Sequence, residues 1–179
     1  MRENPSARRS KRWIQEALLT VMVEKPYSDI TISEICKQAD LTRPTFYQHF
    51  KSKEEVLLQY LDTLFQEFFV YMNEHGIKTI YELAFRFFSF WEAHYDFISL
   101  LEANGILDLL NMRFPQYIGR LVCLIDFAPK SISAQERNYA HSFLSGGLVS
   151  MLKVWGAENC TPDARTLAVY VDNLLKSQK

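Results

Sequence analysis

The chain has 179 residues, of which 48% are hydrophobic and 23% are charged, a composition typical of a globular rather than a disordered protein. Its 20 Lys and Arg residues against 21 Asp and Glu residues give a net charge of −1, which taken alone argues against a nucleic-acid-binding protein. No stretch approaches the roughly 20 apolar residues of a membrane-spanning helix. Three widely separated cysteines indicate neither a disulfide framework nor a metal site. We therefore expect a soluble, cytoplasmic protein without a signal peptide.

Apolar residues recur with a helical period between the few glycines and prolines, so the sequence predicts an all-α fold of about nine helices and no sheet. Ser or Thr followed three residues later by Glu forms a capping box, and three such boxes mark helix starts at Thr31, Ser52 and Ser133. The predicted helices cover residues of about 14–25, 32–39, 42–50, 52–75, 80–95, 97–103, 106–127, 133–155 and 161–175.

Residues 9–55 predict a helix-turn-helix in a three-helix setting, followed by a long helix. The second helix of the motif begins at the cap Thr42, and it has Pro44 in its first turn, where a missing N–H is tolerated. No acidic residue lies between Asp40 and Glu54. The polar and aromatic side chains in that interval are of the kinds that bind phosphates and base edges.

This region resembles the tetracycline-repressor (TetR) family of bacterial transcription regulators over about residues 9–58. The resemblance rests on three motifs, Thr31–Ile35, Ala39–Thr42 and, above all, Thr45–Glu55. It implies that Tyr47 and His49 contact phosphates.

The resemblance also implies that Lys53 binds a phosphate at the start of the long helix, and that residues 43–45 touch bases, although Pro44 stands where the family commonly has Gly or a small residue. The predicted DNA-binding residues are Thr31, Thr42, Arg43, Pro44, Thr45, Tyr47, Gln48, His49 and Lys53.

Charge is divided unevenly along the chain. Residues 1–53 hold ten basic and six acidic residues, a balance of +4, and the remaining residues carry −5. This asymmetry predicts a DNA-binding domain over 1–53 and a regulatory and dimerisation domain over 54–179. The basic run from Arg8 to Arg12 is either an arm that contacts DNA or a solvated, disordered tail.

Aromatic side chains are concentrated in the middle of the chain, where 16 of the 25 fall between Phe46 and Phe97. The family resemblance implies a small-molecule pocket among the middle helices, whereas a plain aromatic core is the other interpretation. The candidate pocket residues are Phe65, Phe69, Phe88, Trp91, Tyr95, Phe114 and Tyr117.

The last two predicted helices resemble the four-helix dimer interface of the family. Gly146 and Gly147 lie inside a helix, which costs about 1 kcal/mol per glycine and is offset by a close helix crossing. The other interpretation is a kink within one monomer's core. The candidate interface residues are Phe143, Gly147, Leu148, Met151, Trp155, Leu167, Val171 and Leu174.

We therefore expect a homodimeric transcription regulator, a repressor that binds a palindromic operator in double-stranded DNA and releases it on binding a small apolar or aromatic effector. The alternative is a regulator of the same fold, possibly an activator, controlled by a partner protein. The four histidines are scattered and the sequence has no phosphate-binding glycine loop, so we expect no enzyme, no cofactor and no metal.

Overall fold

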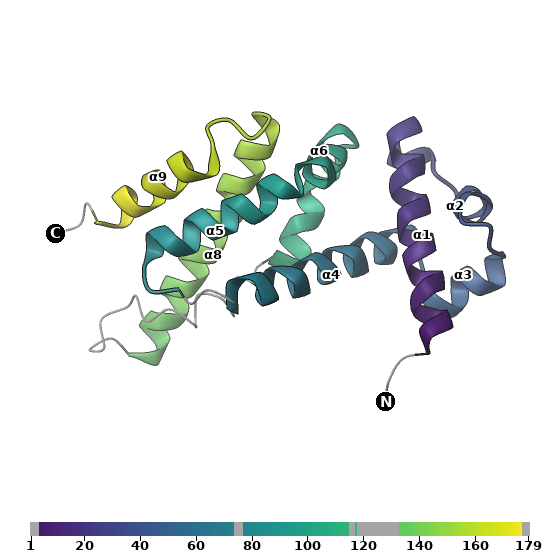
Figure 1. Cartoon of the computed structure of the whole chain (residues 1–179), viewed down its shortest axis with the longest axis horizontal. Coiled ribbons are helices and arrows are strands. Elements are labelled where there is room, and N and C mark those ends of the chain that lie inside the picture. Colours follow the sequence, from purple (N-terminus) through teal and green to yellow (C-terminus); the bar gives the residue numbers. More distant parts are fainter. Residues whose placement is uncertain (1–3, 74–76, 115–116, 118–132, 177–179) are drawn as a thin grey trace. The chain divides into compact units, whose positions relative to one another are not determined.

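The computed structural model describes residues 4–73, 77–114, 117 and 133–176, and every regular element in these ranges is a helix (Figure 1). The predicted all-α fold is confirmed for this part of the chain. The elements are α1 (Pro5–Glu24), η1 (Tyr27–Asp29), α2 (Ile32–Gln38), α3 (Arg43–His49), α4 (Lys53–Asn73), α5 (Ile80–Ala93), α6 (Tyr95–Ala103), η2 (Leu107–Leu109), α8 (Ala134–Ala157) and α9 (Ala164–Lys176), where η marks a 3-10 helix.

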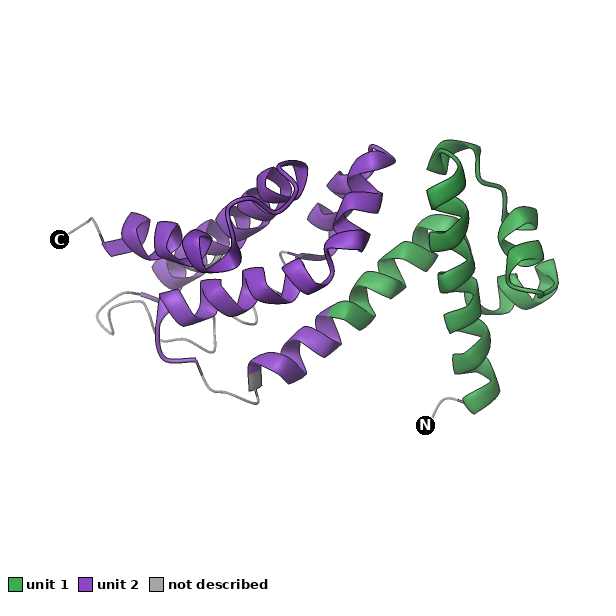
Figure 2. Cartoon of the chain, turned by 45° about the horizontal axis from the view of Figure 1, so that its top comes forward, with its two compact units in different colours: residues 1–64 green, residues 65–179 purple. Residues whose placement is uncertain are grey.

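The chain forms two compact units, residues 1–64 and 65–179, drawn in different colours in Figure 2. Helix α4 begins in the first unit and ends in the second, so it belongs to both. The sequence predicts a domain boundary after residue 53, which is the first residue of α4, whereas the two compact units divide after residue 64.

The first unit is built on a buried stripe of α1. Ile14 and Leu18 are fully buried, and α2 and α3 pack against this helix with Ile35 and Phe46, which are buried to the same degree. Burial of each such side chain stabilises the fold by about 1.5–3 kcal/mol, which holds the two short helices α2 and α3 on α1.

The basic run Arg8–Arg12 lies inside α1. The side chain of Asn4 accepts a hydrogen bond from the amide of Ser6 at 3.0 Å, and Pro5 occupies the first turn, so the helix begins well before the apolar stripe. The interpretation of this run as a disordered tail is therefore wrong.

The second unit has α5 at its centre. Phe87, Phe88, Phe90 and Trp91 are all buried, as expected for a helix that is apolar on several faces. Helix α9 packs against α5, and α6 packs against α8. The ring of Phe88 meets the edge of Trp155 with centroids 5.5 Å apart, which joins α5 to α8.

One predicted helix starts differently from the expectation. Gly105 adopts φ +66°, a conformation that ends α6, and the chain continues as η2 before residues 110–114 become helical. The prediction of one helix over residues 106–127 is therefore wrong at its N-terminal end. Most of the rest of that predicted helix lies outside the described residues.

Candidate nucleic-acid interface

Helix α3 presents one apolar and one polar face. Its cap Thr42 accepts a hydrogen bond from the amide of Thr45 at 3.3 Å, as predicted. Phe46 and Phe50 are buried, which turns the rest of the helix toward solvent. Arg43, Pro44 and Gln48 are exposed, whereas Thr45 and His49 are half-buried.

Tyr47 projects from the exposed face of α3 with half of its surface accessible. Its ring packs edge-on against Phe46, with centroids 5.5 Å apart, and the guanidinium of Arg43 lies 6.0 Å from its centroid. These contacts hold the phenol ring in place beside a cation, so both groups face solvent as one preformed pair.

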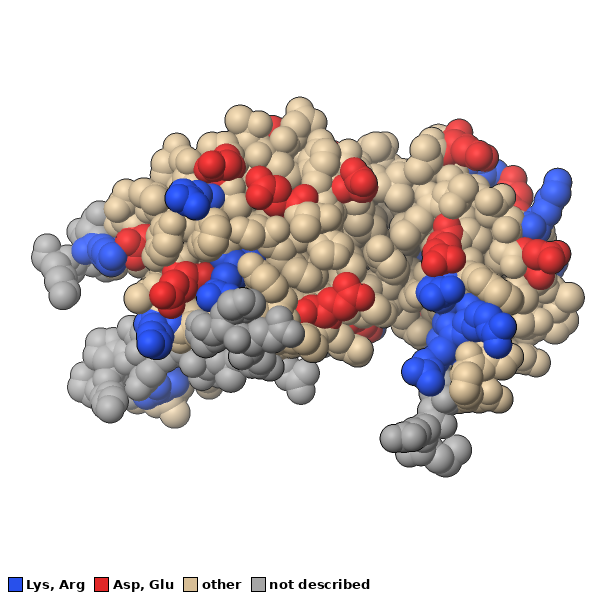
Figure 3. Space-filling model, in the orientation of Figure 1, with Lys and Arg blue, Asp and Glu red and all other residues tan. Residues whose placement is uncertain are grey.

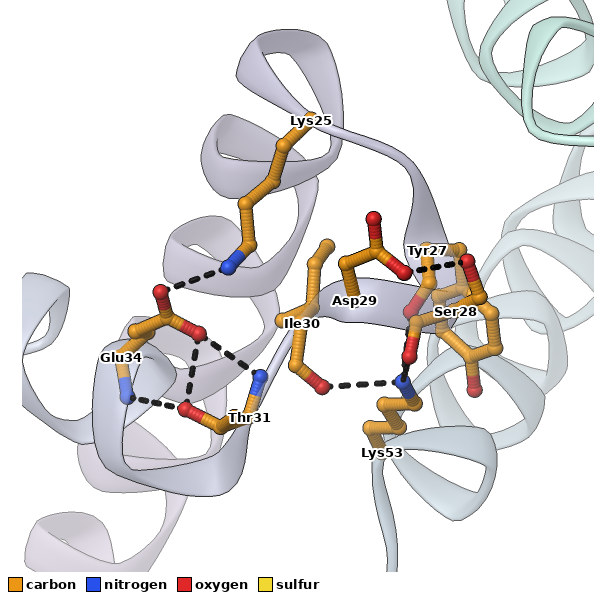
Figure 4. A network of polar contacts seen from close by, with 8 residues as sticks. All are labelled: Lys25, Tyr27, Ser28, Asp29, Ile30, Thr31, Glu34 and Lys53. Atoms are coloured by element: carbon orange, nitrogen blue, oxygen red, sulfur yellow. Dashed lines mark hydrogen bonds and ion pairs between the residues drawn. The ribbon is translucent and has the colours of Figure 1, made fainter.

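Thr31 caps α2 and is engaged with Glu34. The Thr31 amide donates to a Glu34 carboxylate oxygen at 2.8 Å, and the Glu34 amide donates back to the Thr31 hydroxyl at 3.3 Å (Figure 4). Lys25 donates to the other oxygen of Glu34 at 2.6 Å. The hydrogen bonds from Lys25 and Thr31 lower the pKa of Glu34 to about 2.

Lys53, the first residue of α4, points back toward the turn that precedes α2. Its ammonium donates to the carbonyl oxygens of Tyr27, Ser28 and Ile30 at 2.5, 3.2 and 2.9 Å (Figure 4). Burial, with Glu54 as a second cause, raises the pKa of Tyr27 to about 12, so its ring stays neutral beneath the ammonium.

Basic side chains gather at the end of the first unit where α1 begins (Figure 3). Arg8, Arg9 and Arg12 are exposed there. The guanidinium of Arg9 lies 5.8 Å from the centroid of Trp13, and Arg12 pairs with Glu16 at 3.4 Å. The ordered helix therefore carries a fixed cluster of positive charge.

Five of the seven candidate pocket residues form one aromatic cluster in the second unit. The rings of Phe65 and Tyr117 stack at 4.2 Å, and Phe114 lies 4.6 Å from Phe65 and 4.9 Å from Trp91. Phe69 joins through Tyr117 at 5.9 Å.

The other two candidate pocket residues do not contact these five rings directly. Phe88 packs on Trp155 and on Phe87, which in turn contacts Trp91 and Phe114. The hydroxyl of Tyr95 donates to Asn159 at 2.9 Å. Within the cluster, the indole N–H of Trp91 is buried and has no hydrogen-bond partner among the described residues.

The candidate interface residues divide into two groups. Leu148, Trp155, Leu167 and Val171 are buried inside the single chain. The exposed ones, Phe143, Gly147 and Leu174, line a groove of about 320 Å³ between α8 and α9 together with half-buried Met151.

Four exposed apolar residues of α8 and α9 were not predicted from the sequence: Tyr139, Val154, Val169 and Tyr170. They could have been found from the helical period, because they lie on the helix face opposite the buried stripe, where an apolar side chain remains exposed to solvent.

Among the described residues, no group of three or more His, Cys, Asp or Glu side chains is placed to hold a metal ion. In the same residues, no helix combines the length and the apolar character needed to cross a membrane.

The first unit is similar in sequence to known proteins. Residues 14–60 match the profile of the family described as bacterial regulatory proteins, tetR family. The chain is 44% identical over 50 residues to the uncharacterized HTH-type transcriptional regulator YxbF of Bacillus subtilis, and 45% identical over 42 residues to the HTH-type transcriptional regulator EthR of Mycobacterium tuberculosis. These matches cover 27% and 24% of this chain and only 13% and 19% of the two relatives.

Two solved structures share the fold over almost the whole chain. The dihydroxyacetone kinase operon activator DhaS superposes with a TM-score of 0.65 at 18% identity, covering 94% of this chain and 95% of its own. The fatty acid degradation regulator FadR from Bacillus halodurans gives 0.62 at 20% identity, covering 98% of this chain and 96% of its own. At these identities the likeness concerns the fold alone.

Proposed function

We propose that the chain is a DNA-binding transcription regulator, because residues 14–60 match the tetR family of bacterial regulatory proteins. The observation that carries the proposal is the exposed face of α3, which presents Arg43 and Tyr47 and lies in an interval without an acidic residue. In the proposed complex α3 enters the major groove. Residues 43–45 and Gln48 read bases there, and Tyr47 and His49 hold phosphates.

The proposed regulator is a homodimer that binds a palindromic operator. The groove between α8 and α9 supports this, because Phe143 and Leu174 are 71% and 68% exposed and would be covered by a second copy. Two recognition helices related by a two-fold axis contact half-sites about 34–36 Å apart, one turn of DNA.

The proposed protein is a repressor, and it is controlled by a small effector whose binding releases it from DNA. The proposed effector site is the aromatic cluster around Phe65 and Trp91, whose buried rings pack directly on one another and would have to separate to admit an apolar molecule. The buried N–H of Trp91 has no partner among the described residues, and a buried donor without a partner costs about 1–3 kcal/mol, so the proposed effector carries a hydrogen-bond acceptor.

A second candidate is a regulator of the same fold, either an activator or a repressor, that is controlled by a partner protein. The same exposed groove favours it, because apolar side chains in solvent suit a protein surface as well as a second copy. Thermal shift with a panel of apolar compounds distinguishes the two. Stabilisation by a compound supports the effector, whereas a specific protein partner with no stabilising compound supports the alternative.

Selection of bound DNA from a random pool tests the main proposal. We expect a two-fold symmetric consensus. In the variant Arg43→Ala the consensus changes at defined positions, whereas Tyr47→Ala binds all sequences more weakly. Failure to enrich any sequence would refute the assignment.

A further inference from the structure

The ammonium of Lys53 uses its three N–H groups on backbone carbonyls of one short segment. The acceptors are the oxygens of Tyr27, Ser28 and Ile30, and the ammonium lies 4.4 Å from the centroid of the Tyr27 ring. An ammonium has three donors, so this arrangement leaves none for another acceptor.

These three carbonyls lie at a junction of the first unit. They belong to η1 and to Ile30, which connect the end of α1 to Thr31, the cap of α2. Lys53 therefore ties the first residue of α4 to the segment from which α2 and then α3 follow.

The same segment is also held at its other end. Lys25, which follows α1, donates to Glu34, and Glu34 accepts from the amide of Thr31 (Figure 4). Two lysines thus fix residues 27–31 from both ends, one through carbonyls and one through the carboxylate of a capping box.

We infer that Lys53 is a positioning residue, which sets α2 and the recognition helix α3 on the first turn of α4, and that it does not bind a DNA phosphate. This inference rests on the proposed function of DNA binding. A phosphate at Lys53 would have to replace three charge-assisted hydrogen bonds, each stronger than a bond between neutral groups.

The dependence of DNA binding on salt separates positioning from phosphate contact. For Lys53→Met we expect operator affinity to fall by about tenfold or more, the equivalent of one hydrogen bond to a charged group. Affinity for random-sequence DNA and the salt slope should stay as in wild type. If the plot of log affinity against log salt concentration became shallower by about 0.9, and affinity fell equally for operator and random-sequence DNA, Lys53 would contact a phosphate and the inference would be overturned. Unchanged operator binding would also overturn it.

The matched control is Lys51→Met, which removes the same charge two residues earlier from an exposed side chain. We expect it to leave the preference for operator over random DNA unchanged. An equal loss of preference in Lys51→Met would show that charge, not positioning, is responsible.

Lys53→Arg keeps the charge and tests the geometry. A planar guanidinium cannot converge on three carbonyls as an ammonium does, so we expect reduced operator affinity at an unchanged salt slope. Operator binding equal to wild type would contradict the inference. This variant carries the test if Lys53→Met does not fold.

Amide hydrogen exchange, measured without DNA, tests whether Lys53 stabilises the turn at residues 27–30. The amides of Asp29 and Ile30 donate to Pro26 and Tyr27 within η1, and we expect both to exchange faster in Lys53→Met while the amides of α1 do not change. Unchanged exchange would refute the inference. If wild type shows no sequence preference on DNA, the proposed function fails, whereas this measurement still reports on Lys53.

Discussion

Trp91 and Trp155 are buried to the same depth in the second unit, with 0% and 2% of their surface exposed, but their indole N–H groups differ. That of Trp155 donates to the carbonyl of Pro162 at 2.6 Å, and that of Trp91 has no partner among the described residues. The pair therefore separates the contribution of one buried hydrogen bond from that of ring burial.

We expect Trp155→Phe to lower the free energy of unfolding more than Trp91→Phe, by about 1–3 kcal/mol, because both changes remove the same ring volume and only one removes a hydrogen bond. Urea titration of the two variants measures the difference. Equal losses would mean that the Pro162 contact adds nothing to stability.

Glu34 predicts how the stability of the first unit depends on pH. Hydrogen bonds from Lys25 and Thr31 lower its pKa in the folded state from 4.5 to about 2. A depressed folded pKa stabilises the protein above the unfolded value, and this contribution disappears as pH falls from 4.5 to about 2.

We expect the melting temperature of Glu34→Gln to be lower than that of wild type at pH 7, and the gap to close between pH 5 and pH 2. Thermal melts across this range, followed by circular dichroism, give the measurement. The side chain is 44% exposed, so added salt should narrow the gap at pH 7. A gap that persists at pH 2 would contradict the pKa argument.

Glycines along α8 have opposite surroundings. A Cβ at Gly156 would lie 2.6 Å from a methyl carbon of Ile98, whereas a Cβ at Gly146 or Gly147 would meet nothing within 4 Å. Only Gly156 is therefore required for the packing of α6 on α8 within one chain.

We expect Gly156→Ala to destabilise the protein by about 1–3 kcal/mol through overpacking. Gly146→Ala should stabilise it by up to about 1 kcal/mol through helix propensity. Denaturant titrations at equal protein concentration compare the two. A neutral Gly156→Ala would show that Ile98 moves aside freely.

Capping boxes at Thr31 and Ser133 could be predicted because both partners lie within one helical turn. The position of Lys53 could not, since its acceptors lie 23 to 26 residues earlier and depend on how the turn folds. The same holds for α9: the buried sides of Leu167 and Val171 were predicted, but whether α5 or a second copy covers them depends on tertiary packing.

At the scale of the whole molecule, the exposed groove between α8 and α9 predicts how two copies of the chain form a dimer. We expect the double variant Phe143→Glu, Leu174→Glu to be monomeric in analytical ultracentrifugation and to lose operator binding, because both side chains are exposed apolar groups of the proposed interface. Val70→Glu, at a 60% exposed position on α4, is the matched control and should stay dimeric. A double variant that remains dimeric would place the interface elsewhere.

Helix α4 has a consequence for how such regulators are recombined. It is continuous from Lys53 to Asn73, so the two units are joined by a helix rather than by a linker. Each residue inserted into an α-helix turns everything beyond it by about 100° and advances it by about 1.5 Å. A chimera that grafts this DNA-binding unit onto another body therefore has its joint inside a helix, and the spliced residues must themselves favour a helix for α4 to remain continuous.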